Sequence, residues 1–276
     1  MQPLTLASTV TLNNGITMPR LGLGVYRTTP GEEARRAVLA ALECGYRHVD
    51  TAKYYRNEAD VGRALRESGV PRGEVFVTTK LANMDHGYDR ARAACEESLT
   101  KLGLDALDLY LIHWPVEELR GETWAALQDL LDEGLCRAIG VSNYTVRHLN
   151  ELLEWAAIVP AVNQVEFSPF LHQRELLALC REHGVVLEAY SPLTKAQRFG
   201  HPAVQAAAAK HGRTPAQVLI RWALQHDLVV IPKSARPERI RENADVYGFA
   251  LDEADMAALD ALDEGLRTSW DPTGVP

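Results

Sequence analysis

Short apolar segments alternate with helix-patterned segments along almost the whole chain, and this alternation restricts the possible folds more than any other feature. Segments typical of buried strands are expected near residues 21–25, 46–50, 75–79, 107–112, 136–141, 161–165, 185–190 and 228–231. Helical periodicity is expected near residues 31–44, 58–68, 88–102, 121–133, 145–155, 173–183, 202–211, 215–226 and 236–243. Strands separated by helices predict a parallel sheet. Repeating units of roughly 25–30 residues predict an α/β fold of the (β/α)8 TIM-barrel type.

Both ends of the chain carry segments outside this alternation. Near the start, an Asn14-Gly15 pair between short strand-like flanks predicts a β-hairpin, because these two residues adopt the backbone angles of tight hairpin turns. At the other end, residues 267–276 are expected to form a terminal loop. No linker or shift in composition interrupts the 276 residues, so a single domain over residues 1–276 is expected.

The overall composition argues against several classes of partner. A net charge of −8 disfavours nucleic acids and anionic membranes, because both attract basic surfaces. No apolar run approaches the roughly 20 residues of a membrane-spanning helix, and residues 1–6 lack the features of a signal peptide, so a cytoplasmic protein is expected. Dispersed cysteines without metal-ligand spacing predict reduced thiols and no bound metal. They are Cys44, Cys95, Cys136 and Cys180.

Several of the strand-like segments end in side chains that can move protons or bind a ligand. Asp50, Lys80 and His113 close three of these segments. Later segments end in or are followed by Ser142, Asn143, Gln164 and Tyr190. In a parallel barrel the carboxyl ends of all strands point to one face, which is where barrel enzymes carry their active sites. The pattern therefore predicts an enzyme with its site at that face.

Four motifs in a fixed order resemble those of a known family. Residues 50–58 read Asp-Thr-Ala-Lys-Tyr-Tyr-Arg-Asn-Glu, and Lys80 follows them. Further along are Leu-Ile-His-Trp-Pro at 111–115 and Gly-Val-Ser-Asn at 140–143. Over residues 21–243 the chain resembles the aldo-keto reductase family, and most of all its bacterial branch related to 2,5-diketo-D-gluconate and methylglyoxal reductases. The resemblance implies NADPH-dependent reduction of a carbonyl compound.

The same resemblance implies a catalytic tetrad of Asp50, Tyr55, Lys80 and His113. A tyrosine can protonate a carbonyl oxygen if its pKa of about 10 is lowered, and the ammonium group of Lys80 is expected to lower it. Asp50 would hold Lys80 in place, and His113 would hydrogen-bond the substrate carbonyl. The family's spacing selects Tyr55 as the proton donor and leaves its neighbour Tyr54 a packing role.

The resemblance also places NADPH across the mouth of the barrel. Ser142, Asn143 and Gln164 would bind the carboxamide, and Tyr190 would stack on the nicotinamide ring. Other contacts with the cofactor would come from Gly24, Val25, Ser191 and Leu193. The residues matching the family's adenosine-phosphate motif are Lys233, Ser234, Arg239, Glu242 and Asn243. Because cationic side chains suit a 2′-phosphate, NADPH is expected in preference to NADH.

One segment departs from the family pattern. After Tyr-Ser-Pro-Leu at 190–193 many relatives continue with glycine, whereas this chain has Thr194, Lys195 and Ala196. Glycine lets a backbone approach a pyrophosphate closely. The contribution of this segment to cofactor binding is therefore left open, with Lys195 as a possible replacement charge contact.

The predicted substrate pocket is aromatic. By their positions in the family, Tyr26, Trp114 and Trp270 would form its walls. The loop after His113 is short, so an open pocket for small aldehydes, α-dicarbonyl compounds or keto-sugars is expected. The family also implies a monomer.

Two other functions stay open at the level of sequence. Lys80 at a strand end could form a Schiff base with a carbonyl substrate, although that chemistry gives no role to Tyr55 or to Lys233 and Arg239. The chain could also be a sensor that binds NADPH without catalysis, although an intact tetrad argues against that function.

Overall fold

The structure, a computed structural model, describes residues 4–276; residues 1–3, which begin the segment considered for a signal peptide, lie outside the described residues. Within residues 4–276, eight parallel strands form one sheet in the order β10-β9-β8-β7-β6-β5-β4-β3. The strands are β3 (Leu23–Gly24), β4 (His48–Asp50), β5 (Phe76–Leu81), β6 (Leu109–Ile112), β7 (Ile139–Ser142), β8 (Val162–Glu166), β9 (Val186–Tyr190) and β10 (Val229–Val230).

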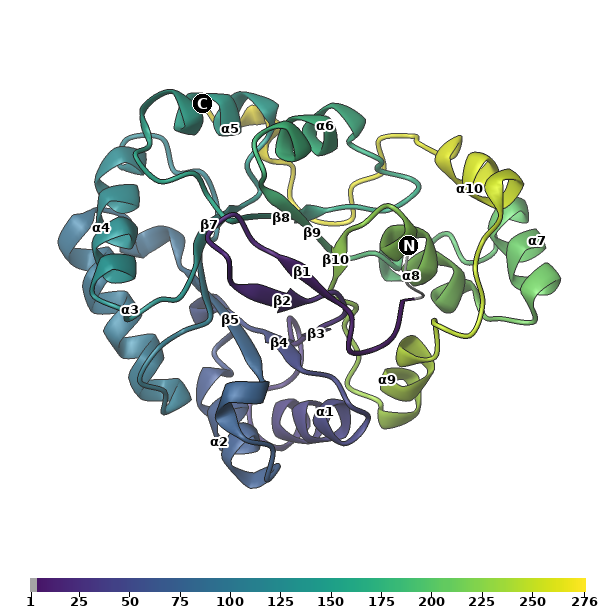
Figure 1. Ribbon diagram of the computed structural model, residues 1–276, viewed down its shortest axis with the longest axis horizontal. Coiled ribbons are helices and arrows are strands. Elements are labelled where there is room, and N and C mark those ends of the chain that lie inside the picture. The colour runs from purple at the N-terminus through teal and green to yellow at the C-terminus, as the bar shows by residue number, and fades with distance from the viewer. Residues whose placement is uncertain (1–3) are drawn as a thin grey trace.

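Backbone contacts beyond the regular ladder join the two edges of this sheet. The amide of Gly22 donates to the carbonyl of Val230 at 2.9 Å, and the amide of Val230 donates to the carbonyl of Arg20 at 2.9 Å. A further parallel bridge links Gly24 to Lys233. Closure removes the free edges that an open sheet would expose. The predicted (β/α)8 TIM barrel is therefore confirmed (Figure 1).

Helices surround the strands as the periodicity predicted (Figure 1). They are α1 (Glu32–Glu43), α2 (Glu58–Glu67), α3 (Tyr88–Leu102), α4 (Arg120–Asp132), α5 (Val146–Trp155), α6 (Arg174–Glu182), α7 (Pro202–His211), α8 (Pro215–Gln225) and α9 (Pro237–Ala244). Thr214 illustrates how the sequence begins such a helix, because its hydroxyl accepts the amide of Gln217 at 3.3 Å at the start of α8.

Helix α10 (Glu253–Asp260) is the element that the periodicity did not indicate. Its cap is readable in the sequence, since the carboxylate of Asp252 accepts the amide of Asp255 at 2.9 Å. Only Asp255 and Leu259 of this helix are buried. Its apolar residues are mostly small alanines, and most of its apolar positions are consecutive, so the sequence shows almost no hydrophobic period.

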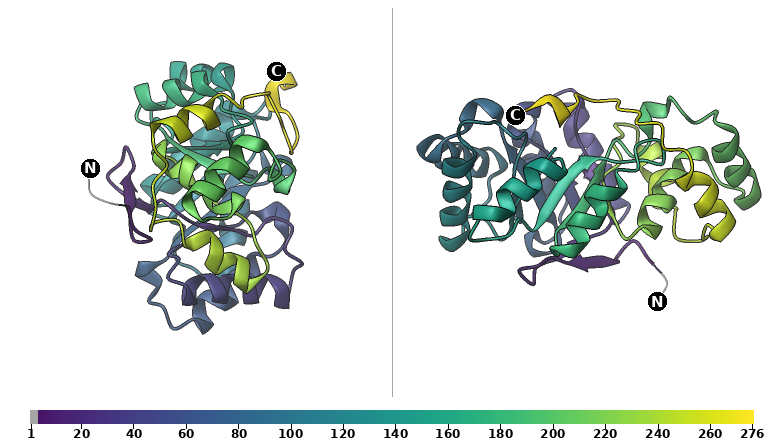
Figure 2. Two further views of the ribbon diagram at one scale, coloured as in Figure 1. Left: turned by 90° about the vertical axis from the view of Figure 1, so that its right-hand side faces the viewer. Right: turned by 90° about the horizontal axis from the view of Figure 1, so that it is seen from above.

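The N-terminal hairpin closes the bottom of the barrel. Strands β1 (Thr9–Thr11) and β2 (Thr17–Pro19) pair antiparallel around the Asn14-Gly15 turn, as predicted. Met18 is fully buried beneath the strands, in a cluster that includes Phe76, at the N-terminal end of β5. Figure 2 shows the hairpin at one end of the molecule and the C-terminal segment at the opposite end.

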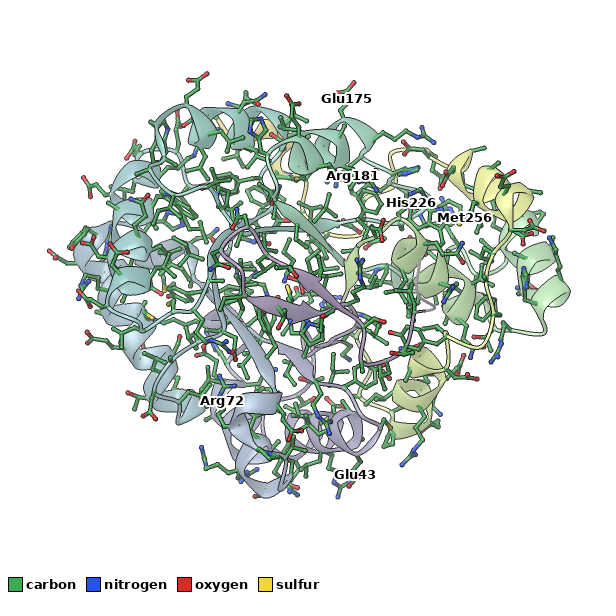
Figure 3. The ribbon with its side chains drawn as sticks, viewed as in Figure 1. Glu43, Arg72, Glu175, Arg181, His226 and Met256 are labelled. Carbon is green, nitrogen blue, oxygen red and sulfur yellow. The ribbon has the colours of Figure 1, made fainter. Side chains whose placement is uncertain are left out.

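The interior of the barrel is a packed core, and Figure 3 shows side chains crowding the space between the strands. Lys80 is one of its largest fully buried side chains. In the stretch 4–276, no helix has the length and apolar character needed to cross a bilayer. The tail 267–276 is mostly loop, as expected, apart from a short 3-10 turn at Pro272–Gly274.

Candidate active site

The centre of the site is a buried ion pair at the ends of two neighbouring strands. Asp50 is the last residue of β4, and Lys80 is the penultimate residue of β5. The ammonium group of Lys80 donates to both carboxylate oxygens of Asp50, at 2.7 and 2.6 Å, and to the carbonyl of Thr51 at 2.8 Å. Lys80 is fully buried and Asp50 nearly so. Removing two charges from water is costly, and this cost is offset here by close pairing and additional hydrogen bonds.

Tyr55 lies directly above this ion pair. It ends a 3-10 turn, Lys53–Tyr55, that follows β4, and the ammonium group of Lys80 donates to its phenol oxygen at 3.4 Å. Lys53 anchors the turn through ion pairs with Asp85 at 2.9 Å and Glu97 at 2.7 Å.

The neighbouring Tyr54 is 67% exposed, and the centre of its ring lies 6.3 Å from that of His113 in an edge-on arrangement. The motif spacing selected the tyrosine that contacts Lys80.

The surroundings of Tyr55 do not lower its pKa. Burial raises the pKa of the phenol well above its usual value, and the negative charge of Asp50 adds to the rise. The expected lowering by Lys80 is therefore corrected: the carboxylate of Asp50 lies 2.6 Å from that ammonium group and neutralises its charge, whereas the phenol oxygen of Tyr55 lies 3.4 Å away. The consequence is a phenol that stays protonated at neutral pH.

His113 lies beside the half-buried Tyr55 and is itself buried. The two ring centres are 5.7 Å apart, with the rings nearly perpendicular. Burial lowers the pKa of His113 to about 3, and the charge of Lys80 contributes to this shift. The imidazole is therefore neutral at pH 7, and a neutral imidazole can donate one hydrogen bond to a carbonyl oxygen without carrying a full charge.

The polar residues at the ends of β7, β8 and β9 are joined in one hydrogen-bonded network. The hydroxyl of Tyr190 donates to the side-chain oxygen of Asn143 at 2.8 Å, and the side-chain nitrogen of Asn143 donates to the carbonyl of His113 at 2.9 Å. Ser142 donates from its hydroxyl to the carbonyl of Gln164 at 2.8 Å. Asn143 has a φ of 65°, in the left-handed region that Asn tolerates better than most residues.

Gln164 connects this network to the ion pair. Its amide nitrogen donates to Asp50 at 2.8 Å and to Glu188 at 2.8 Å. The sequence analysis assigned no role to Glu188, which is fully buried in the middle of β9. An acidic residue inside an apolar strand of a parallel sheet is the signal that would have found it, because such strands are covered on both faces.

The residues predicted for the adenosine phosphate lie where β10 meets β3. Lys233 bridges to Gly24, which brings the predicted phosphate group and the predicted backbone contact at Gly24 and Val25 together. Within the described part of the chain, neither Lys233 nor Arg239 has an ion-pair partner within 4 Å, and both are exposed. Ser234 and Asn243 are buried, and Glu242 is half-buried.

The departure from the family pattern folds as a left-handed turn after β9. Thr194, Lys195 and Ala196 have φ values of 48°, 50° and 64°, and Ser191 has 49°. The amide of Thr194 donates to the carbonyl of Ser191 at 3.0 Å, and the amide of Ala196 donates to that of Leu193 at 2.8 Å. These angles are ones that glycine adopts without strain.

Lys195 extends from this turn toward the C-terminal tail. Its ammonium group donates to the carbonyl of Thr268. In this structure the side chain therefore links two loops, and the charge contact with the cofactor stays a prediction.

The predicted aromatic residues gather around Tyr55 and His113. Tyr26 packs on Tyr55 with 4.9 Å between ring centres, and Trp114 lies 6.3 Å from His113. Trp270, in the C-terminal tail, meets Trp114 at 4.6 Å between ring centres and is 58% exposed. The three predicted pocket residues are thus brought to one place by segments that are far apart in the sequence.

Glu166 anchors the tail that carries Trp270. It is buried at the end of β8, and its carboxylate accepts the amide of Thr268 at 2.8 Å, the hydroxyl of Thr268, and the amide of Ser269 at 3.1 Å. The sequence analysis did not single out Glu166, and only the contact with residues a hundred positions later explains its burial.

One group of potential metal ligands lies outside this site. Among residues 4–276, the ligand atoms of His172, His226 and Asp260 all lie within 4.8 Å of one another. One oxygen of Asp260 already accepts the indole N–H of Trp222 at 2.7 Å and lies 2.8 Å from a ring nitrogen of His226. These contacts connect α8 and α10, on the side of the molecule where Figure 3 marks His226. The four cysteines are free thiols.

Comparisons with known proteins agree with this geometry. The sequence pattern of the Aldo/keto reductase family matches residues 20–201 and 200–264. Glyoxal reductase of Bacillus subtilis (strain 168) is 49% identical over 270 residues, which cover 98% of each chain. A solved aldo-keto reductase from a Medee basin deep-sea metagenome library superposes with a TM-score of 0.94, at 44% identity, over 98% of this chain and 100% of that one. The Bombyx mori aldo-keto reductase, solved in complex with NADP, superposes with a TM-score of 0.89 at 38% identity, over 96% and 95% of the chains.

Proposed function

This chain belongs to the aldo/keto reductase family, and from that premise we propose that it reduces small aldehydes and α-dicarbonyl compounds with NADPH, with Tyr55 as the proton donor. The observation that carries the proposal is the contact between Tyr55 and Lys80, 3.4 Å long, above the Lys80–Asp50 ion pair. A relative named glyoxal reductase supports a small dicarbonyl as the substrate.

The contacts of Tyr55 define how it would transfer its proton. Lys80 donates to the phenol oxygen, so the phenol hydrogen stays free for a substrate oxygen. As that hydrogen leaves, negative charge grows on the phenol oxygen, and the ammonium group at 3.4 Å stabilises it. The raised pKa keeps the proton on Tyr55 until a substrate accepts it.

His113 and the aromatic residues would orient the substrate. The neutral imidazole of His113 can donate to the carbonyl oxygen from the side next to Tyr55. Tyr26 and Trp114 flank this position, and Trp270 packs on Trp114. Tyr26 and Trp270 are both exposed, which suits a site open to small substrates.

The residues at the mouth of the barrel fit NADPH. Exposed Lys233 and Arg239 offer cationic donors of the kind that a 2′-phosphate requires. Ser142, Asn143 and Gln164 supply amide and hydroxyl groups for the carboxamide, and Tyr190 supplies an aromatic face. Contacts along the remaining length would come from Gly24, Val25, Ser191, Leu193, Ser234, Glu242 and Asn243. NADPH, when bound, supplies the hydride that reduces the carbonyl carbon.

A Schiff base on Lys80 fits the structure poorly. A nucleophilic lysine must lose its proton, whereas the Lys80 ammonium group is surrounded by the two oxygens of Asp50 and the carbonyl of Thr51. Among the described residues, no contact favours this chemistry.

The proton-donor role is tested by Tyr55→Phe, with Tyr54→Phe as the matched control. The loss of a general acid is expected to lower kcat about 10²–10⁴-fold, while NADPH binding, followed by its fluorescence, is retained. Glyoxal, methylglyoxal and an aromatic aldehyde serve as substrates. Unchanged turnover in Tyr55→Phe would show that Tyr55 is not the proton donor. Tight NADPH binding by the wild type without turnover of any carbonyl would favour the sensor function.

The phosphate assignment has its own test. Arg239→Ala is expected to weaken NADPH binding by about tenfold or more while leaving NADH binding unchanged, because a charged hydrogen bond to phosphate is lost. The control is Arg236→Ala, whose guanidinium instead pairs with Glu238 at 2.6 Å. Equal losses for both cofactors would contradict a 2′-phosphate contact.

A further inference from the structure

A second buried carboxyl group lies beneath the Lys80–Asp50 ion pair. Glu188 is fully buried, and one of its oxygens accepts the amide nitrogen of Gln164 at 2.8 Å. The same nitrogen donates to Asp50 at 2.8 Å. Gln164 therefore ties the ion pair to a group that cannot contact a substrate.

The other oxygen of Glu188 has no hydrogen-bond partner among residues 4–276. It lies 3.6 Å from a ring nitrogen of His48, which is itself 3.1 Å from the hydroxyl of Thr78. Gly22 makes room for this arrangement, because a Cβ at that position would come within 2.5 Å of the His48 ring. The barrel is thus built around two ionisable side chains that the proposed mechanism does not use.

An ionised Glu188 would be poorly tolerated in this position. It faces the Asp50 carboxylate across a single shared amide, and the one full positive charge among the residues around it, Lys80, is already paired with Asp50. Burial and the charge of Asp50 raise the pKa of Glu188 to about 8. Burial lowers the pKa of His48 to about 3, so this histidine offers no positive charge at neutral pH.

We propose that Glu188 is a positioning residue that acts as a neutral acid: it holds Gln164, and through Gln164 it holds Asp50 and Lys80 in the arrangement that serves Tyr55. This inference rests on the proposed function. When Glu188 loses its proton to water at alkaline pH, a second negative charge competes for Gln164. That charge also makes Tyr55 a weaker acid, and therefore a poorer proton donor in the reduction.

Glu188→Gln is the discriminating variant, because glutamine keeps the acceptor for Gln164 and cannot ionise. The ratio of its kcat/KM to that of the wild type, with glyoxal and NADPH, is expected to be near one at pH 6. The ratio is expected to rise to about threefold or more at pH 9.5, where only the wild type carries the extra charge. Ionisations that both proteins share cancel in this ratio. A ratio that is constant with pH would overturn the proposal. Glu182→Gln, at an exposed carboxyl at the end of α6, is the control.

A measurement without turnover separates this inference from the proposed function. In protein labelled with ¹³C at the glutamate carboxyl carbon, one resonance is expected to titrate near pH 8 and to be absent from Glu188→Gln. If Glu188→Gln does not fold, Glu188→Asp removes the same resonance and provides the assignment. No resonance titrating above pH 6 would overturn the proposal even in an active enzyme. Failure of the wild type to reduce any carbonyl would instead refute the proposed function.

Thermal unfolding gives a second, independent test, because the proposal fixes the direction in which the Tm difference between Glu188→Gln and the wild type changes with pH. A carboxyl whose pKa is raised by folding stabilises the fold below its unfolded pKa of about 4.5, and this contribution is lost as the pH rises through about 8. The Tm of Glu188→Gln relative to the wild type is therefore expected to increase between about pH 5 and pH 9. A difference that stays constant over this interval would show that Glu188 is ionised throughout, and would overturn the proposal.

Discussion

At the scale of single residues, the site depends on one buried cation and its carboxylate. Lys80 has no access to water, and its ammonium group donates to both carboxylate oxygens of Asp50, to the carbonyl of Thr51 and, at the longer distance of 3.4 Å, to the phenol oxygen of Tyr55. Such a pair contributes little net stability compared with apolar residues of the same size, yet removing one member leaves the other charged and unpaired. A substitution that disturbs the arrangement of Lys80 and Asp50 is therefore expected to lower the stability of the fold as well.

Lys80→Met tests that coupling. It is expected to lower the free energy of unfolding by about 3–5 kcal/mol, because the Asp50 carboxylate is left buried without its partner. The double variant Asp50→Asn with Lys80→Met is expected to recover part of the loss. Urea denaturation followed by circular dichroism measures both. A single variant as stable as the wild type would show that Asp50 is protonated in the fold.

The pH dependence of folding carries a second signature at this scale. His113 is neutral in the fold down to a pKa of about 3, whereas an unfolded histidine takes up a proton near pH 6.5. A lowered histidine pKa therefore costs stability as the pH falls from about 6.5 toward 3. His113→Asn is expected to be less sensitive to acid than the wild type in melts between pH 7 and pH 4. Parallel pH curves would contradict a buried neutral imidazole.

At the scale of elements, two loops after neighbouring strands complete the site. The turn at 194–196 places three consecutive residues in the left-handed region, and Lys195 connects it to the tail at Thr268. Glu166 at the end of β8 binds the same part of the tail. The position of Trp270 over Trp114 thus depends on contacts made outside the aromatic pocket itself.

Glycine at one position of this turn should stabilise the fold. Ala196→Gly is expected to raise the free energy of unfolding by about 1 kcal/mol, because the left-handed conformation strains a side chain with a Cβ. The control variant is Ala257→Gly, at an exposed position of α10. It is expected to lower the free energy of unfolding by about 1 kcal/mol, because glycine is unfavourable inside a helix. Chemical denaturation measures the stability of both variants. A loss of stability in Ala196→Gly would contradict the left-handed conformation of Ala196.

Release of the tail is expected to change substrate binding more than chemistry. Glu166→Ala removes the acceptor for Thr268 and Ser269, which weakens the anchoring of the tail by about 1–3 kcal/mol. The KM for carbonyl substrates should rise while kcat is largely retained, and limited proteolysis should cleave the tail sooner. Glu264→Ala, at an exposed ion pair with Arg198, is the control. A fall in kcat with an unchanged KM would place Glu166 in the chemistry instead.

At the scale of the whole molecule, the hairpin that packs on the core and the candidate active site lie at opposite ends of the barrel axis. The hairpin packs Met18 against the bottom of the barrel, and the site lies at the carboxyl ends of the strands. Figure 2 shows the hairpin and the C-terminal segment at opposite ends. The division follows from the parallel sheet, which directs all strand ends of one kind to the same face.

Met18→Ala tests this separation. The fully buried side chain leaves a cavity when truncated, so the free energy of unfolding should fall by about 2–5 kcal/mol. The KM and kcat of the proposed reduction should stay within twofold of the wild type at temperatures where the variant is folded, a margin of ~0.4 kcal/mol. A large change in KM would show that the bottom of the barrel influences the site.

The monomeric state expected from the sequence stays a prediction.

The sequence by itself determined the order of the elements and the identity of the residues at the strand ends. Alternating apolar and amphipathic segments specify strands and helices locally, and a parallel sheet then fixes where strand ends lie. Asp50, Lys80 and His113 could therefore be predicted together, and the motif spacing chose Tyr55 over Tyr54. Helix α10 escaped prediction because its apolar residues do not follow the helical period.

Only the tertiary structure decided how these residues affect one another. Burial raises the pKa of Tyr55, whereas the sequence suggested that Lys80 would lower it, because desolvation depends on what surrounds a group in space. Glu188 and Glu166 gain their importance from partners at Gln164 and in the tail. Such pairings join positions far apart in the chain, and local sequence patterns carry no information about which distant groups will share a buried hydrogen bond.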